Sequence, residues 1–180
     1  MDFEINGLPL HPLLVHATIV ILPVAALATI LSSISPKIRH RLGIANPIIT
    51  FIALLLVPLT QAAGTWLYSR IEATPQITRH TEFGTMVLPW AAGLFLVSLT
   101  QWLMDRHREV KYYDNATGKE IDVPETFIPE KERLPKPKNP ALPALMSILA
   151  ALVAVGTLLA VYSAGESGTR AVWERILGSS

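Results

Sequence analysis

Four long apolar stretches alternate with polar segments along the chain. They cover residues 13–34, 47–68, 83–104 and 141–162, and none of them contains Asp, Glu, Lys or Arg. Each stretch has about the 20 residues that a helix needs to cross a hydrocarbon layer of roughly 30 Å. The pattern therefore predicts four transmembrane helices.

The spacing of these stretches predicts the fold class. The connectors after the first and second stretches are short, which favours antiparallel neighbours. The longest polar segment, residues 105–140, leaves no room for a second soluble domain. We therefore expect an all-α protein, one integral membrane domain over residues 1–180 that forms a four-helix up-down bundle.

The chain after the fourth stretch predicts one further short helix. Gly165-Glu-Ser-Gly168 has the composition of a turn. Beyond it, apolar residues recur along one side of a helix, at Ala171, Val172, Trp173, Ile176 and Leu177. Such an amphipathic helix is expected to lie along the outer membrane interface with Trp173 as its anchor.

The polar segment 105–140 carries its own pattern. Val110–Asp114 and Lys119–Val123, with Gly118 between them, predict a short β-hairpin. A proline-rich stretch from Leu134 to Pro140 predicts an extended lead into the fourth helix. The segment is either a solvated connector near anionic lipid headgroups or a docking surface for a partner protein.

The distribution of Lys and Arg predicts the orientation. Eleven of the 15 lie in the segments 35–46 and 105–140, and four lie on the other side. Because positive charge favours the cytoplasmic side, these two loops should be cytoplasmic and both termini outside. We expect a multi-pass protein of a bacterial inner membrane.

Composition excludes several kinds of site. Of all residues 51% are hydrophobic and 16% are charged, against about 25% charged in a soluble domain. Cysteine is absent, which excludes disulfides and thiolate-held metals. We find no nucleophile–base pair, phosphate-binding loop or paired carboxylates, so an enzyme without a cofactor is not expected.

Histidines near the outer end are the strongest candidates for chemistry. An ionisable side chain within a membrane helix is costly and suggests function, and imidazole is a common ligand of haem and metals. His16 and His80 lie on different helices at similar expected depth, so they could be the two ligands of one haem b or one metal ion. Gly84, one turn after His80, would leave room for a flat macrocycle, and Gln61 could donate a hydrogen bond there.

Purely structural roles of the three histidines stay open as alternatives. His11 lies five residues before His16, about 140° around the helix, so the two do not share a face. His11 is expected to bond backbone or headgroups at the helix start. His16 could instead be a neutral side chain bonded to Gln61, and His80 an interfacial side chain near lipid phosphate.

Three segments of the chain resemble one bacterial family. Gly7-Leu-Pro-Leu-His-Pro-Leu-Leu-Val-His16 resembles the opening of the predicted membrane proteins called domain of unknown function 2231. Arg79-His80 with Gly84 is similar to that family's His-x-x-x-Gly, and Gly165–Trp173 is similar to its closing segment. The resemblance implies four membrane helices, with His11, His16 and His80 at the family's histidine positions.

The same resemblance gives a hint of function. Related domains are sometimes joined to Rieske-type iron–sulfur domains, which implies electron transfer. This chain has no such domain, carries Glu166 where relatives often have His, and has an unusual insertion between the third and fourth helices. A redox role would then need a separate partner protein.

Three functions follow as hypotheses. The first is a protein that binds haem b, or less well a metal ion, and transfers electrons. The second is a non-catalytic accessory or assembly subunit of a membrane complex, in which the histidines are structural. The third and weakest is a small transporter, since no inverted repeat is visible.

Overall fold

The computed structural model describes residues 2–106, 112–113, 120–121 and 141–177. Within these residues there are five helices, namely α1 (Leu10–Ile34), α2 (Pro36–Leu42), α3 (Ala45–Tyr68), α4 (Pro75–Arg106) and α5 (Ala141–Leu177). Two antiparallel strand pairs accompany them, β1 (Glu4–Ile5) with β2 (Leu8–Pro9) and β3 (Tyr112–Tyr113) with β4 (Glu120–Ile121).

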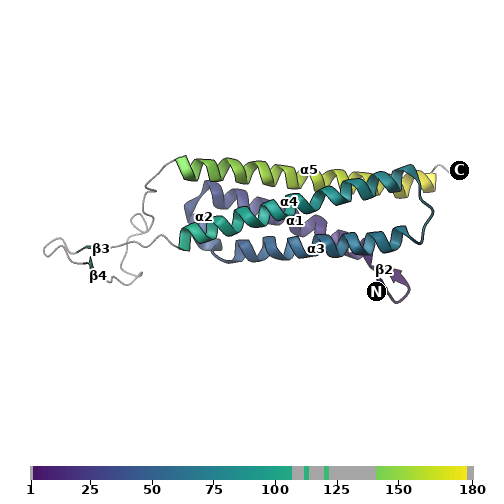
Figure 1. Cartoon of the computed structure of the whole chain (residues 1–180), viewed down its shortest axis with the longest axis horizontal. Coiled ribbons are helices and arrows are strands. Elements are labelled where there is room, and N and C mark those ends of the chain that lie inside the picture. Colours follow the sequence, from purple (N-terminus) through teal and green to yellow (C-terminus); the bar gives the residue numbers. More distant parts are fainter. Residues whose placement is uncertain (1, 107–111, 114–119, 122–140, 178–180) are drawn as a thin grey trace.

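The four long helices run side by side as a bundle (Figure 1). α1 packs against α3 and α5, and α4 packs against the same two helices, so α1 and α4 occupy opposite corners. Both termini lie at one end, where α1 and α4 begin and α3 and α5 end; we call it the histidine end. The other end, which carries α2, is the loop end. The expected all-α membrane bundle is confirmed.

The packing of the bundle is that of a protein in lipid. All four long helices are long and apolar enough to cross a membrane. Their buried residues are mostly small, for example Ala25, Ala53, Ala91 and Ala154, whereas many large apolar side chains are exposed. Small residues let helix backbones approach closely where lipid offers no hydrophobic drive for association.

Buried hydroxyl groups link the helices to one another. Thr18 of α1 meets Thr60 of α3 at 3.0 Å between the hydroxyl oxygens, and Thr50 of α3 meets Ser98 of α4 at 2.6 Å. Each hydroxyl has one proton, so Thr18 and Thr60 bond each other when one of them does not donate to the carbonyl one turn earlier in its own helix. Many polar side chains therefore find partners inside the bundle, whereas Ser32 Oγ, Trp66 Nε1 and Gln101 Oε1 are buried with no partner among the described residues.

The short interfacial helix expected after residue 165 does not form as a separate element. α5 runs unbroken from Ala141 to Leu177, and neither Gly165 nor Gly168 has a positive φ. The two glycines continue the helix, and Gly168 lies directly against the ring of His80. Its lack of a side chain permits a close helix contact instead of a turn.

Two hairpins flank the bundle. The strands expected within 110–123 form, with Tyr112 opposite Ile121, while the turn at Gly118 lies outside the described residues. The hairpin of β1 and β2 was not predicted, although its Asn6-Gly7 pair is a strong signal for one. Both residues have positive φ, 51° and 79°, as a type I′ turn requires.

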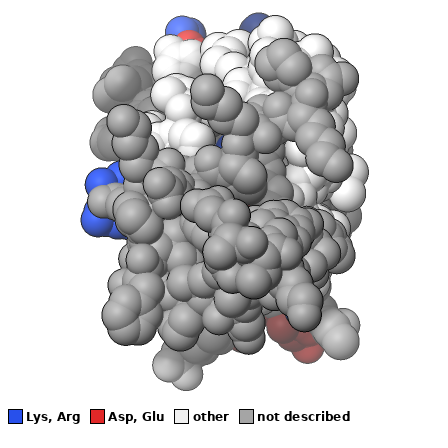
Figure 2. All heavy atoms as spheres, turned by 90° about the vertical axis from the view of Figure 1, so that its left-hand side faces the viewer, with Lys and Arg blue, Asp and Glu red and all other residues white. Residues whose placement is uncertain are grey.

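At the loop end, α2 connects α1 to α3 along the chain. It carries the basic residues Lys37, Arg39 and Arg41. Figure 2, the view onto this end, shows described Lys and Arg side chains at its rim. Arg39 turns back to the bundle, where its Nε donates to Asp105 at 3.0 Å and its guanidinium also donates to the Ser32 carbonyl at 3.2 Å. This ion pair ties α2 to the end of α4.

We expect Asp105→Ala to lower the free energy of unfolding by about 1.5–3 kcal/mol, because it leaves a guanidinium that is only 15% exposed without its carboxylate. The midpoint of thermal unfolding in detergent measures the effect. Arg41→Gln, a change at an exposed residue of the same helix, is the control. Equal midpoints for the two variants would show that the ion pair does not hold α2.

Candidate functional site

His11 is placed by the N-terminal hairpin. The backbone amide of Leu10 donates to Phe3 at 2.9 Å, and α1 begins at Leu10 directly after β2. Pro12 falls within the first turn, where a missing amide proton costs no helical hydrogen bond. His11 therefore points inward from the first turn of α1.

His80 is placed by the start of α4. The hydroxyl of Thr74 accepts from the amide of Ile77 at 3.3 Å, and Pro75 is the first helical residue, as the sequence predicts. His80 follows in the second turn. Its Nδ1 donates to the carbonyl of Ala164 at 3.0 Å and lies 3.2 Å from the hydroxyl of Ser167, both on α5.

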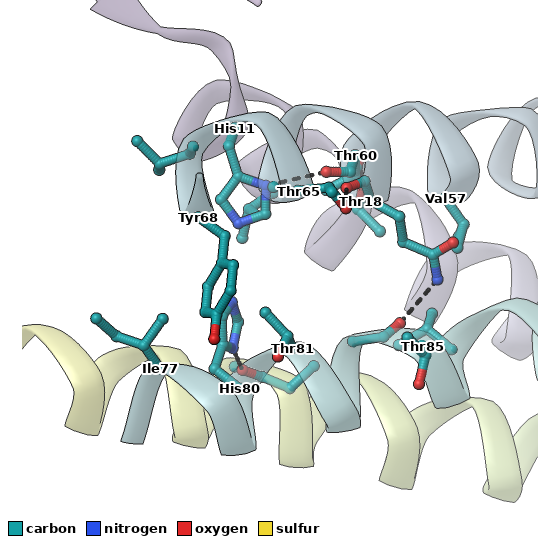
Figure 3. Close-up of a pocket in the computed structure, with 18 of the residues that line it drawn as sticks. His11, Thr18, Val57, Thr60, Thr65, Tyr68, Ile77, His80, Thr81 and Thr85 are labelled. Atoms are coloured by element: carbon teal, nitrogen blue, oxygen red, sulfur yellow. Dashed lines mark hydrogen bonds between the residues drawn. The ribbon is translucent and has the colours of Figure 1, made fainter. Parts of the chain in front are cut away.

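The structure brings His80 together with His11. Their ring centroids lie 6.0 Å apart with an interplanar angle of 68°, and Figure 3 shows the two rings pointing toward one another. Nδ1 of His11 donates to the carbonyl of Thr60 at 3.0 Å. Because a carbonyl can only accept, Nδ1 carries the proton in both rings. In a neutral ring of this tautomer, Nε2 carries no proton.

Each histidine ring is seated on a glycine of a neighbouring helix. A Cβ built on Gly64 of α3 would lie 2.9 Å from the ring of His11, and one built on Gly168 of α5 would lie 3.0 Å from the ring of His80. Any larger residue at either position would push the ring aside. The contact with the glycine, which we call the glycine seat, and the Nδ1 hydrogen bond together fix the position of each ring.

A cavity extends from the two histidines into the bundle. It has a volume of about 190 Å³, and all four long helices contribute to its lining. The lining is mainly apolar, with Val15, Ile19, Val57 and Val87 among its residues. The exposed Thr65 of α3 and Thr85 of α4 are also among its lining residues.

Gln61 and Gly84 both line this cavity, as two of the expected site residues. The side-chain amide of Gln61 donates to the carbonyl of Gly84 at 2.9 Å and so bridges α3 and α4. A Cβ on Gly84 would meet no atom within 4 Å. Gly84 therefore leaves open space beside His80, whereas the amide of Gln61 is already engaged.

His16 is not brought to His80. It is exposed on α1, its Nδ1 lies 2.6 Å from the carbonyl of Pro12 in its own helix, and it does not line the cavity. The expectation that His16 and His80 face each other is therefore not met. The 140° between His11 and His16 admits only one of them to the interior, and it is His11.

Several residues at the site were not predicted. Tyr68 and Thr81 line the cavity, and Figure 3 shows Tyr68 beside His80. The hydroxyl of Tyr68 lies 3.5 Å from that of Thr78. No motif marks these residues in the sequence; their position near the ends of the predicted helices is the only signal.

The ligand count limits what the site can hold. Across the part of the chain that the structure describes, no three His, Cys, Asp or Glu side chains gather into a group that could hold a metal ion. A structural zinc ion takes four protein ligands and a catalytic one takes three. Two histidines alone suit a cofactor that brings most of its own donor atoms.

Comparison with known proteins agrees with the fold. A model of the family described as predicted membrane protein, domain of unknown function 2231, matches residues 7–122, which include His11, His16, His80 and Gly84. No curated protein and no solved structure matches the chain. Because the match spans well over half of the 180 residues, this chain belongs to the family of predicted membrane proteins called domain of unknown function 2231.

Proposed function

We propose that this protein binds haem b at the histidine end through His11 and His80 and takes part in electron transfer. The proposal rests mainly on the separation of the two imidazole rings, whose centroids lie 6.0 Å apart. Two imidazoles that ligate one metal at about 2.0–2.1 Å through facing nitrogens place their centroids roughly 6 Å apart. His11 and His80 would hold the haem iron through their imidazole nitrogens.

The surroundings of the rings support the same proposal. Histidines that ligate a metal usually donate their second ring nitrogen to a carbonyl or carboxylate, which orients the ring and raises its basicity. Both His11 and His80 make such a bond, to Thr60 and Ala164. The open wall at Gly84 gives a flat group space beside the ligands.

The cavity is smaller than the pockets that enclose a whole ligand. Pockets that enclose a drug-sized ligand have about 300–1,000 Å³, and this cavity has about 190 Å³. A macrocycle held by the two histidines would therefore reach beyond this cavity. Its edge would face lipid or a partner protein.

Within this proposal, bound haem supplies one-electron chemistry, and the chain controls the setting. His11 and His80 hold the ligand geometry through Thr60 and Ala164, and the apolar lining keeps water away from the ligands. The excess of Lys and Arg in the segments 35–46 and 105–140 supports a location of the site on the outer side of a bacterial inner membrane. A redox partner would dock from that side.

A reduced-minus-oxidised visible spectrum of the detergent-purified protein, expressed with ample haem, tests the proposal. We expect Soret and α bands that are lost in His11→Ala and in His80→Ala. His16→Ala is the matched control and should keep both bands, since His16 lies outside the cavity.

A colourless protein that is monodisperse and fully helical would refute haem binding. It would favour the accessory-subunit hypothesis. Bands that survive His11→Ala but vanish in His16→Ala would return the ligand role to His16.

A further inference from the structure

A second hollow lies on the outside of the histidine end, along the seam of α4 and α5. It is a polar groove of about 380 Å³ that is separate from the histidine cavity. Four charged side chains line it, Arg79 of α4 and Glu166, Arg170 and Glu174 of α5. Neither the family assignment nor the haem proposal gives this groove a role.

The depth of the groove follows from the apolar stretches. Arg79 lies four residues before the stretch 83–104, and Glu166 lies four residues after the stretch 141–162. Four helical residues span about 6 Å. The headgroup layer on each side of the hydrocarbon is about 5–8 Å thick. Arg79 and Glu166 therefore lie at the level of the lipid headgroups, and Glu174, two helical turns beyond Glu166, marks the outer end of the groove.

Two of the four charges already neutralise each other. Arg170 donates to the carboxylate of Glu166 at 2.9 Å and 3.1 Å, one helical turn away. Arg170 acts on Glu174 only at longer range. The groove is thus left with one further cation and one further anion.

Each of these two remaining charges contacts an uncharged side chain. The guanidinium of Arg79 lies 5.6 Å from the ring centroid of Phe83, and the carboxylate of Glu174 accepts from the neutral amide of Gln76 at 2.8 Å. Among the described residues neither Arg79 nor Glu174 forms an ion pair. A ligand with one negative and one positive group would supply both counter-charges.

We propose that this groove binds the headgroup of a phospholipid with a primary amine, such as phosphatidylethanolamine. Arg79 would bind the phosphate, because a guanidinium matches phosphate oxygens in a planar, two-pronged geometry. Glu174 would accept from the ammonium, which offers three donors. The headgroup depth of the groove favours a membrane lipid over a phosphate free in solution.

Native mass spectrometry of the full chain, released from vesicles with equal phosphatidylethanolamine, phosphatidylcholine and phosphatidylglycerol, tests the proposal. We expect phosphatidylethanolamine to be retained preferentially. Phosphatidylcholine has no ammonium proton to donate and should be retained less. Arg79→Gln and Glu174→Gln should each lower retention about five- to tenfold, since each removes one charge-assisted contact.

Arg70→Gln and Glu72→Gln are the matched controls. Both residues lie at the same end of the bundle outside the groove, and Arg70 rests on the ring of Trp66 at 3.8 Å. They should retain the lipid as the unaltered chain does. Arg79→Lys keeps the positive charge but loses the two-pronged geometry, so its retention should lie between that of Arg79→Gln and that of the unaltered chain, which separates loss of contact from loss of fold.

Other outcomes would overturn the proposal. These are equal retention of the three lipids, preference for the anionic lipid, or unchanged retention in Arg79→Gln and Glu174→Gln. Displacement of the lipid by millimolar inorganic phosphate would identify a site for free phosphate instead.

Discussion

Replacing Gly168 by alanine is expected to lower haem occupancy about tenfold while the bundle stays folded. The new Cβ would lie 3.0 Å from Cε1 and 3.2 Å from Nδ1 of the His80 ring, closer than ordinary contact allows. The ring must shift, and its hydrogen bond to Ala164 must lengthen or break. Changes to the groups that orient a metal ligand typically cost 10–100-fold in affinity.

Gly165 provides the matched control three residues earlier on α5. A Cβ at Gly165 would meet no atom within 4 Å. Gly165→Ala should therefore keep full haem occupancy and stabilise the helix by about 0.5–1 kcal/mol, the usual gain when alanine replaces a helical glycine. Soret absorbance per protein, measured at fixed haem, compares the two variants.

Gly64→Ala should behave like Gly168→Ala from the other side of the site, because its Cβ would lie 2.9 Å from the ring of His11. If Gly168→Ala and Gly64→Ala both bind haem as well as Gly165→Ala, the glycine seats do not position the ligands. Loss of haem in all three variants would indicate a general loss of packing.

The membrane bundle could be predicted from the sequence because its signal is strong and local. Four charge-free stretches of sufficient length leave few alternatives for the chain. The break at Gly165–Gly168 was predicted wrongly from composition. Glycine marks either a turn or a close contact, and only the position of His80 on another helix decides between them.

The sequence also contains a signal that identifies His11 as the partner of His80. On α1, His11, Thr18, Ala25 and Ser32 follow one another at intervals of seven, and the last three are buried. A seven-residue interval nearly closes two helical turns, so these residues share the inward face. The expected depth in the membrane does not decide whether His11 or His16 faces His80. The seven-residue interval does, because His16 does not belong to it.

The same interval supports the placement of His80. Val87, Leu94 and Gln101 follow it at steps of seven, and all three are buried. The spacing of residues along one helix does not reveal the angle at which two helices pack against each other. The 6.0 Å separation of the rings and the seats at Gly64 and Gly168 depend on tertiary packing, which one sequence does not specify.

Replacing Gly156 by alanine is expected to destabilise the bundle by about 1–3 kcal/mol, the usual cost of an added methyl group in a tightly packed contact. Gly156 lies in the middle of α5, where a Cβ would overlap the indole of Trp90 on α4. The hydroxyl of Thr157 donates to Val153 of its own helix at 2.8 Å and lies 3.4 Å from the backbone carbonyl of Trp90, so the two helices are in close contact there. The better helix propensity of alanine, at most about 1 kcal/mol, does not offset an overlap of this kind.

A double-mutant cycle separates the overlap from other effects. Trp90→Leu removes the indole and opens the space that a methyl group at residue 156 needs. The variant Gly156→Ala with Trp90→Leu should therefore unfold at nearly the same midpoint as Trp90→Leu alone, with a coupling of about 0.5–3 kcal/mol. Gly84→Ala, where a Cβ would meet open space, is the control for adding a methyl group to a membrane helix. A midpoint for Gly156→Ala equal to that of Gly84→Ala would contradict the expected overlap, because the indole, 39% exposed, would then have moved out toward lipid without cost.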